Sequence, residues 1–319
     1  MTVRQSTIED LPEIVSLLKK SIGEILTPKT EAYFSWKHEQ NPFGRSKVLL
    51  AIEDEKIVGL RAFMHWRWVG GRESFSAVRA VDTATDPAFQ GKGIFKKLTL
   101  QAVDECKAEG VDLVFNSPNP VSMQGYLKMG WHSIGRLPIY IGLGSFLPGK
   151  YSQEAINSAY HRYDVQVALE NFDPKLTLST SAEALHTNID HKYLKWRYQD
   201  CPVSKYGAVI KKGKYGFVFR LKRVSRFIEF RICEAWTEHA GAGSEAKKAI
   251  RKVVSDIKPA IISCGATPLF DSGKTKVSLL FGPFRKGPVI TIRPLATANL
   301  DNFEEFKKWE PSIGSIELF

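Results

Sequence analysis

The spacing of apolar positions predicts alternating strands and helices in the first half of the chain. An apolar, β-prone run extends from Phe75 to Ala84, and after a short turn the apolar residues recur with helical spacing. The run Val111–Phe115 has the pattern of a short buried strand, and a second helical stretch follows it. The chain therefore predicts strand, helix, strand and helix in that order. The first of these helices is marked by Ile94, Leu98, Leu100 and Val103.

A glycine-rich turn, Gln90-Gly91-Lys92-Gly93, joins the first of these strands to its helix. A turn that opens a helix leaves several backbone N–H groups without partners, and the helix dipole adds positive potential at the same point. Glycine lets a ligand approach the backbone because it has no Cβ. Lys92, Lys96 and Lys97 add positive charge around the turn. We interpret this turn as a cradle for a pyrophosphate group.

The pattern of the turn narrows the choice of ligand. The P-loop pattern GxxxxGK[ST] does not occur, and the Rossmann pattern GxGxxG fails because only Gly91 and Gly93 are present. The segment resembles the [Q/R]-x-x-G-x-[G/A] coenzyme A loop of the GNAT superfamily of N-acetyltransferases. Gln90, Gly91 and Gly93 match, and Pro87 stands where that family often has a proline. Phe95 replaces the last glycine or alanine, and we expect it to reshape the adenine end of the site without abolishing binding.

A second motif strengthens the resemblance. The GNAT pattern N-x-x-[A/S]-x-x-x-Y-x-x-x-G-[F/W] is matched in register by Asn119, Ser122, Tyr126, Gly130 and Trp131. In that family the asparagine contacts the pantetheine arm, and the tyrosine protonates the leaving thiolate. Gly130 is expected to end the helix as its C′ residue. The resemblance covers residues 1–145, because the opening of the chain also looks like the first strand of the family and its capped first helix, with Thr7 or Ser6 as the cap and Glu9 and Asp10 in the first turn.

The resemblance implies an α+β (α/β) GNAT fold with a mixed, mostly antiparallel sheet flanked by helices. It implies an acetyl-CoA-dependent N-acetyltransferase that acts on a primary amine, with acetyl-CoA as co-substrate and no metal. Two alternatives stay open, a tRNA-dependent aminoacyltransferase on a tandem GNAT fold and a coenzyme A-binding regulatory protein with little turnover. The acyl length, the acceptor amine and the oligomeric state are left open.

The resemblance also assigns roles to single residues. Tyr126 is the expected general acid, and Asp82 is the nearest carboxylate on the strand that could serve as base, although an ion pair is an equal reading of it. The acceptor is expected at Glu31, Phe34, His38 and His65. Tyr33 and Trp36 are interpreted as packing residues. The expected donor contacts are Val81, Thr83, Thr85, Gln90, Gly91, Lys92, Gly93, Ile94, Phe95, Asn116, Asn119 and Ser122.

The second half of the chain resembles a degenerate copy of the first half. The segment Tyr193–Arg197 repeats the pattern of Tyr33–Lys37 160 residues later, and β-prone runs follow a proline in both halves. Two unrelated domains with a chance match are the alternative. Where the cradle should recur, the chain reads 240-AGAGSE-245, with an acid in the place of a phosphate. We therefore expect a catalytic domain at 1–145 and a degenerate GNAT-like domain, structural or acceptor-shaping, at 146–319.

Composition excludes several classes of protein. The chain has 43% hydrophobic residues, no apolar stretch of membrane-spanning length and no signal-peptide pattern at its start, so we expect a cytoplasmic protein. The four cysteines and seven histidines show no metal-binding spacing. Residues 1–145 carry 18 basic and 16 acidic residues, and the remainder carries 27 and 18. The basic second half leaves nucleic acid unlikely but not excluded as a partner, because its aromatic residues mostly keep the period of a buried strand face.

Overall fold

A computed structural model describes residues 1–24, 27–145, 147–148, 152–173, 184–265, 267, 269, 280–296 and 301–316. The chain forms two compact units, and each unit contains residues from both ends of the chain. The first unit comprises Met1–Gly135 and Val289–Phe306, and the second comprises Arg136–Pro288 and Lys307–Leu318.

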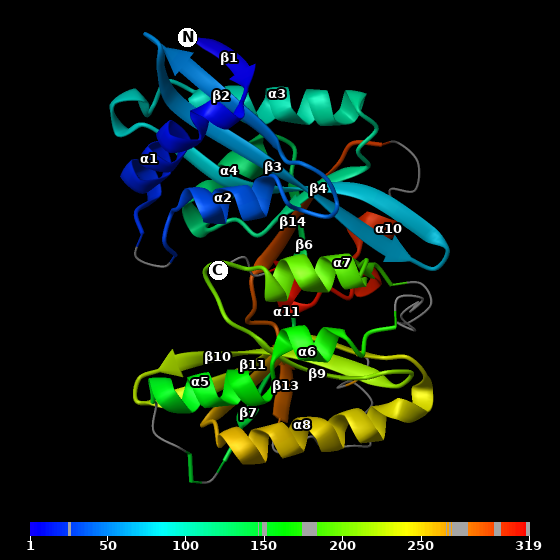
Figure 1. Cartoon of the computed structure of the whole chain (residues 1–319). Coiled ribbons are helices and arrows are strands. Elements are labelled where there is room, and N and C mark those ends of the chain that lie inside the picture. The colour runs from blue at the N-terminus through cyan, green and yellow to red at the C-terminus, as the bar shows by residue number, and fades with distance from the viewer. Residues whose placement is uncertain are drawn as a thin grey trace. The chain divides into compact units, whose positions relative to one another are not determined.

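The first unit is built on one mixed sheet with strand order β1-β2-β3-β4-β5-β14-β6 (Figure 1). Neighbouring strands from β1 to β4 pair antiparallel, β4 and β5 pair parallel, and β14 pairs antiparallel with β5. The elements of this unit are β1 (Thr2–Gln5), η1 (Ile8–Asp10), α1 (Leu11–Ile22), α2 (Glu31–His38), β2 (Lys47–Glu53), β3 (Lys56–Gly70), β4 (Glu73–Thr85), η2 (Pro87–Phe89), α3 (Ile94–Ala108), β5 (Leu113–Asn116), α4 (Pro120–Lys128), β6 (His132–Arg136), β14 (Val289–Pro294) and α10 (Asp301–Glu304).

Helices cover both faces of this sheet, and the sequence pattern explains how. On one face the apolar residues of α3, such as Leu98 and Val103, pack with Tyr126 of α4 against Phe63 and Val78. On the other face α1 and α2 pack against the alternate positions of β2 and β3. Successive strand residues point to opposite faces, so strands buried on both sides read as continuous apolar runs. The run expected at 75–84 forms β4, and its apolar residues lie on both faces of the strand.

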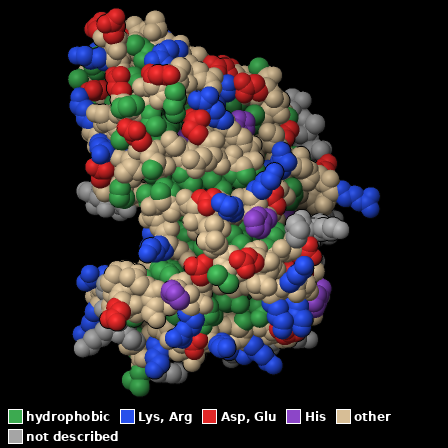
Figure 2. Space-filling model, in the orientation of Figure 1, with side chains coloured by type: hydrophobic (Ala, Val, Ile, Leu, Met, Phe, Trp, Pro, Cys, Tyr) green, Lys and Arg blue, Asp and Glu red, His purple; other side chains and the backbone are tan. Residues whose placement is uncertain are grey.

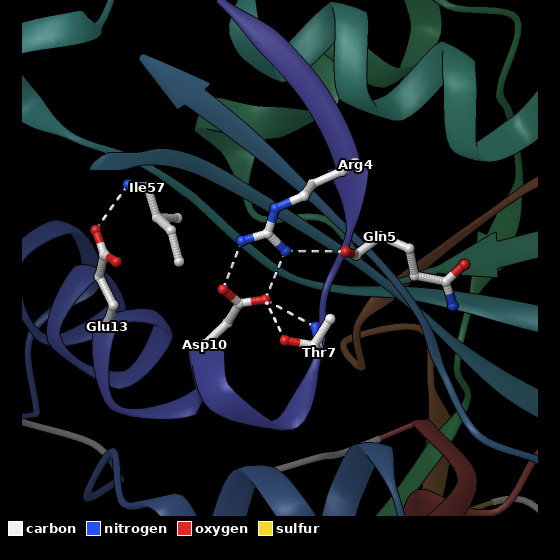
Figure 3. A network of polar contacts seen from close by, with 6 residues as sticks. All are labelled: Arg4, Gln5, Thr7, Asp10, Glu13 and Ile57. Atoms are coloured by element: carbon white, nitrogen blue, oxygen red, sulfur yellow. Dashed lines mark hydrogen bonds and ion pairs between the residues drawn. The ribbon is translucent and has the colours of Figure 1, made fainter. Parts of the chain in front are cut away.

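The first helix begins at a network of polar contacts (Figure 3). The Asp10 carboxylate accepts hydrogen bonds from the Thr7 backbone N–H at 2.7 Å and from both terminal nitrogens of Arg4, at 2.7 and 2.6 Å. Arg4 and the Thr7 donor together lower the pKa of Asp10 to about 2. Glu13 of α1 accepts from the Ile57 N–H at 2.7 Å, which ties α1 to β3. Of the two expected caps, Thr7 is the N-cap residue of the opening turn.

The second unit repeats the sheet of the first, with strand order β9-β10-β11-β12-β7-β13. Its strands β11 and β12 are the parallel pair, as β4 and β5 are in the first unit. The elements of this unit are β7 (Ile139–Leu143), α5 (Gln153–Arg162), α6 (Val165–Leu169), β8 (His186–Thr187), α7 (His191–Leu194), the π-helical turn η3 (Lys195–Gln199), β9 (Gly207–Lys211), β10 (Tyr215–Val224), β11 (Phe227–Thr237), η4 (Ala240–Ala242), α8 (Gly243–Ile257), β12 (Ile261–Gly265), β13 (Leu280–Phe284), η5 (Phe306–Lys308) and α11 (Ile313–Ile316).

The two halves of the chain exchange one strand each. In the first unit β14 lies between β5 and β6, and in the second unit β7 lies between β12 and β13. Both are the proline-led runs that the sequence places at corresponding points of the two halves, Pro138–Ile141 and Pro288–Ile292. The expected division between residues 145 and 146 assigned β7 to the first half and β14 to the second. By packing, each strand lies in the unit formed mainly by the other half.

The aromatic residues of the basic strands in the second half lie in its core. Phe217, Phe219 and Phe230 are fully buried against α8, in a cluster that includes Leu221 and Ile228. This confirms the alternating pattern expected from the sequence. Phe227 does not keep this alternation; it is partly buried at the start of β11, and the Arg226 guanidinium lies 5.1 Å from the centre of its ring.

The charged surface of the second unit is mixed in sign. On the face of that unit drawn in Figure 2, Lys and Arg side chains are interspersed with Asp and Glu. Several basic residues have acidic partners, since Lys214 and Lys211 pair with Glu245 and Arg231 pairs with Glu229. Over the part of the chain that the structure describes, no helix is both long and apolar enough to cross a bilayer. The four cysteines are free and buried.

Candidate active site

The parallel strands β4 and β5 are paired over only a short length. Their register covers Ala77–Arg79 of β4 and Leu113–Phe115 of β5. Beyond this point β4 continues to Thr85, whereas β5 ends at Asn116. The carboxyl ends of the two strands lead directly into the glycine-rich turn before α3 and into the start of α4. Such ends of parallel strands are common ligand sites in open sheets.

The turn before α3 has the geometry expected of a phosphate cradle. Gly91 and Gly93 adopt φ angles of 78° and 75°, which L side chains rarely tolerate. A Cβ added to either glycine would meet nothing within 4 Å, so open space lies beside the backbone at both positions. Gly93 is the N-cap residue of α3, and no side chain caps this helix. The first N–H groups of a 15-residue helix are therefore free to bind an anion.

The side chains around the turn leave that space open. Gln90, Lys96 and Lys97 are exposed, and the Lys92 ammonium lies 4.4 Å from the centre of the Phe89 ring. Ile94 is the first residue of α3 and is buried in the core, so its side chain anchors the helix and only its backbone faces the turn. The residues present fit a pyrophosphate, with backbone donors at the centre and lysines at the rim.

The two asparagines expected to contact the donor also have structural partners. Asn119 is the N-cap of α4, and its Oδ1 accepts from the Ser122 N–H at 2.8 Å and from the Ser122 hydroxyl at 2.9 Å. This leaves the amide nitrogen of Asn119 as its exposed donor. Asn116 is buried at the end of β5, and its Oδ1 accepts a short hydrogen bond from the Thr291 hydroxyl of β14. Asn116 thus holds the exchanged strand.

Tyr126 combines the environment of a core residue with the position of a catalytic one. It is 3% exposed on α4, and its ring meets Phe95 edge-on at 5.5 Å and Trp131 at 5.2 Å. Gly125 lies directly against the Phe95 ring, where an added Cβ would be 3.0 Å away. The Phe95 ring therefore points toward Tyr126. The expected effect of Phe95 at the adenine end finds no support in this geometry. Gly130 follows the C-cap residue Met129, as expected for C′.

A residue that the sequence analysis did not single out lies beside this tyrosine. Arg61 of β3 is fully buried, and its guanidinium carbon lies 5.3 Å from the centre of the Tyr126 ring. Phe63 and Phe95 complete the surroundings at 4.9 and 5.7 Å. The available signal was a charged residue inside the otherwise uncharged run 57–64 of β3.

Asp82 occupies a β-bulge in β4. Thr83 pairs with Arg61 and Val81 with Ala62, which leaves Asp82 as the extra residue, with a φ of 33°. Its Oδ2 accepts from the Lys37 ammonium at 2.7 Å and from His38 Nε2 at 2.8 Å. Burial acts to raise the pKa of Asp82, but the Lys37 charge and the His38 hydrogen bond outweigh it and hold that pKa well below its usual range. Such a carboxylate is a poor proton acceptor near neutral pH.

In the first unit the Asp82 carboxylate at the bulge thus binds two residues of α2, a contact that we call the clasp. The second unit contains the same kind of contact at the corresponding bulge. There Cys233 is the extra residue of β11, and the neighbouring Glu234 accepts from the Tyr193 and Tyr198 hydroxyls at 2.9 and 2.8 Å. Tyr198 stands 160 residues after His38, and Arg197 stands 160 residues after Lys37. Burial raises the pKa of Glu234. The clasp recurs in a unit whose loop has no cradle, and in both units it joins a helix to the bulge. The ion pair of Asp82 is with Lys37.

The residues expected at the acceptor site do not gather at one place. Phe34 is a core residue against α1, its ring 4.3 Å from that of His38. His38 is fully buried, its Nδ1 lies 2.9 Å from the Ser46 hydroxyl, and burial lowers its pKa. Glu31 is exposed in the first turn of α2. His65 pairs with Val78, well along β3 from Arg61, and burial lowers its pKa.

The β4 residues that are expected to contact the donor through their backbone lie at the end of the strand that does not pair with β5. Val81, Thr83 and Thr85 are partly buried and lie beyond the segment that pairs with β5. The Thr85 carbonyl accepts from the Ser21 hydroxyl at 3.0 Å, and the Thr83 hydroxyl lies 3.4 Å from the Leu60 carbonyl. After Arg79, the edge of β4 that faces β5 is no longer paired with that strand, so its backbone groups can contact a ligand.

At the corresponding helix start in the second unit, a carboxylate of the protein itself takes the place of a bound anion. Glu245, in the first turn of α8, accepts from the Lys214 ammonium at 2.7 Å. A carboxylate there occupies the favourable end of the helix dipole, which explains why the loop needs no phosphate. No asparagine-to-tyrosine motif occurs in the sequence after Gly265, and most of residues 266–279 lie outside the described part of the chain. Among the residues described, no group of His, Cys, Asp or Glu side chains could hold a metal ion.

The fold and this site resemble those of one family. Residues 2–134 match the family described as acetyltransferase (GNAT) domain. This part of the chain is therefore similar to a GNAT acetyltransferase domain, and the second unit repeats its sheet. Among curated proteins no sequence matches the chain.

Solved structures share the fold across both units. A probable N-acyltransferase from Enterococcus faecalis V583 superposes with a TM-score of 0.64 at 12% identity, over 92% of this chain and 72% of its own. A GCN5-related N-acetyltransferase from Anabaena variabilis gives 0.63 at 11%, over 92% and 73%. Eis1 from Mycobacterium abscessus gives 0.56 at 11%, over 92% and 74%. At these identities the likeness shows the fold alone.

Proposed function

We propose that the protein is an acetyl-CoA-dependent N-acetyltransferase that acts on a primary amine, with its one catalytic site in the first unit. The observation that carries this proposal is the uncapped start of α3, where Gly91 and Gly93 leave open space beside free backbone donors. The second support is Tyr126, one helix away in the order that the GNAT motifs prescribe. The proposal places the donor between the ends of β4 and β5, where pairing between these strands stops.

The residues of the first unit would then have separate roles in donor binding and in proton transfer. The Gly91–Gly93 turn and the lysines at its rim hold the pyrophosphate, and the free edge of β4 after Arg79 offers backbone N–H groups to the thioester carbonyl. The amine attacks that carbonyl carbon, the carbon–sulfur bond breaks, and Tyr126 gives its proton to the sulfur. Because Asp82 is held in its ion pair, the proposal has the amine lose its proton to water.

A thiol-release assay with acetyl-CoA and a panel of amino sugars, polyamines, peptides and aminoglycosides tests this proposal. We expect turnover with at least one amine, and we expect Tyr126→Phe to lower kcat about 100-fold with unchanged acetyl-CoA affinity, because the general acid is lost. Tyr163→Phe in the second unit, which removes a hydroxyl bound to Asp256, is the matched control and should keep wild-type turnover. A protein that binds acetyl-CoA but releases no thiol with any amine would be a coenzyme A sensor.

A further inference from the structure

Arg61 is a buried positive charge whose guanidinium has no hydrogen-bond partner in the described structure. Its side chain is 0% exposed, and all three of its guanidinium nitrogens are without a hydrogen bond in the described structure. Burying an ion without hydrogen bonds costs several kcal/mol, so such groups are normally paired. The residues around Arg61 on this face of the sheet are apolar or aromatic. The stability of the unit gives no reason for a charge at this place.

Three aromatic rings enclose this guanidinium. Its carbon lies 4.9 Å from the Phe63 centroid, 5.3 Å from that of Tyr126 and 5.7 Å from that of Phe95. Cation–π contacts offset part of the cost of burial. They also fix the charge next to Tyr126, the residue that gives up a proton in the proposed reaction. Phe95, the departure from the GNAT loop pattern, closes the group from the α3 side.

The second unit shows what packing alone needs at this position. Arg61 lies with Phe63 on the face of β3 that packs against α3 and α4. On the corresponding face of β10, which α8 covers, the residues are Phe217, Phe219 and Leu221, and all three are buried and apolar. Apolar side chains suffice in the unit whose helix start is occupied by Glu245. The arginine occurs in the unit that has the cradle.

We propose that Arg61 is a positioning residue for catalysis, whose charge stabilises the Tyr126 phenolate as the phenol proton passes to the leaving sulfur. This inference rests on the proposed function. In the step concerned, the electron pair of the carbon–sulfur bond goes to sulfur, sulfur takes the proton of Tyr126, and a negative charge is left on the phenol oxygen. The guanidinium offsets that charge until water returns the proton.

This assignment explains why Arg61 has no permanent partner. A fixed charge in a dry, apolar site stabilises best a charge that appears only during the reaction, since no solvent must reorganise around it. A carboxylate on the acyl group of the donor would be a permanent partner instead. The two readings differ in which donors depend on Arg61, and donors with and without a carboxylate separate them.

The test compares Arg61→Met and Arg61→Lys with wild type in the thiol-release assay, with acetyl-CoA and succinyl-CoA as donors. We expect Arg61→Met to lower kcat with acetyl-CoA about 100-fold with KM changed less than about 2-fold. We also expect the basic limb of its pH–rate profile to move to higher pH, because the phenolate is no longer stabilised. Arg61→Lys keeps the charge and should recover most of the rate. Arg79→Met, at another buried arginine, should leave the limb in place.

Folding of the variant is checked separately, by thermal denaturation. Arg61→Met exchanges an unpaired buried charge for an apolar side chain, so its Tm should be equal to or above that of wild type. Wild-type kcat in Arg61→Met, or an unmoved basic limb, overturns the inference and leaves the proposed function intact. A loss confined to KM for succinyl-CoA also overturns it and assigns Arg61 to a carboxylate. A wild type that releases no thiol defeats the proposed function, and the inference with it.

Discussion

Asp82 is an aspartate with a positive φ in a β-bulge, and its carboxylate holds two residues of α2. The side chains of Lys37 and His38 are 4% and 0% exposed, so removing the carboxylate would leave a buried ammonium without its partner. Bulges re-aim side chains, and this one turns Asp82 to the α1–α2 face of the sheet. Because Glu234 makes the same kind of contact in the second unit, we expect the contact to serve stability and not proton transfer.

Asp82→Asn should therefore lower stability more than turnover. We expect a loss of about 3 kcal/mol in the free energy of unfolding at pH 7, because breaking a buried ion pair leaves a charge unpaired. Urea denaturation measures it, with Glu53→Gln at an exposed ion pair as a control close to wild type. The folded variant should keep kcat within about 10-fold of wild type, and a larger loss in a folded, acetyl-CoA-binding variant would make Asp82 the general base.

The pH dependence of this contribution follows from the lowered pKa of Asp82. A carboxyl whose pKa is lower in the folded state stabilises the fold above its unfolded value, near pH 4, and loses that contribution as the pH falls. The stability difference between wild type and Asp82→Asn should shrink below pH 4 by about 1.4 kcal/mol per pH unit. Urea denaturation between pH 7 and pH 3 records it. A difference that stays constant over this range would contradict the ion pair.

At the level of elements, the exchange of β7 and β14 ties each unit to both halves of the chain. β14 pairs with β5 from Thr291 to Pro294, and the Thr291 hydroxyl donates to the buried Asn116 carboxamide. Asn116 is also the residue at which β5 ends, next to the open end of β4. The exchanged strand thus supports one wall of the candidate site.

Thr291→Val should destabilise the first unit without removing the site. The change keeps the shape of the side chain but leaves the Asn116 oxygen buried without its donor, which costs about 1–2 kcal/mol. Thermal denaturation should show a lower Tm for Thr291→Val and a nearly unchanged one for Thr291→Ser, which keeps the hydroxyl. Equal Tm values for Thr291→Val and wild type would mean that this hydrogen bond does not hold β14.

Local sequence patterns predicted most of these elements, because the buried face of a strand or a helix sets the spacing of its apolar residues. The runs at 75–84 and 111–115 and the helix after Gly93 all form as expected. The exchange of β7 and β14 could not be read from the sequence, since both runs satisfy either sheet equally well. The same holds for Asp82, whose partner Lys37 lies 45 residues away. Arg61 could have been noticed as a charge within an apolar strand, but its neighbours Phe95 and Tyr126 come from other elements.

At the scale of the whole molecule, the residues that the structure describes form two related sheets, and one of the two corresponding helix starts has an open cradle. In the first unit the start of α3 is open, and in the second the start of α8 is filled by Glu245 and its lysine partners. The greater positive charge of the second half is partly used in such internal pairs. Each chain should therefore bind one donor molecule, in the first unit.

Calorimetric titration of acetyl-CoA into the full chain at physiological salt tests this claim most directly. Wild type should bind one acetyl-CoA per chain with a Kd of about 1–100 µM. Gly93→Glu should abolish binding by placing a carboxylate in the open space of the cradle. Gly213→Glu, at a glycine of the second unit with a φ of 73° and equally open surroundings, carries the same strain and charge and should bind as wild type. No binding to wild type, or binding that survives Gly93→Glu, would contradict the account.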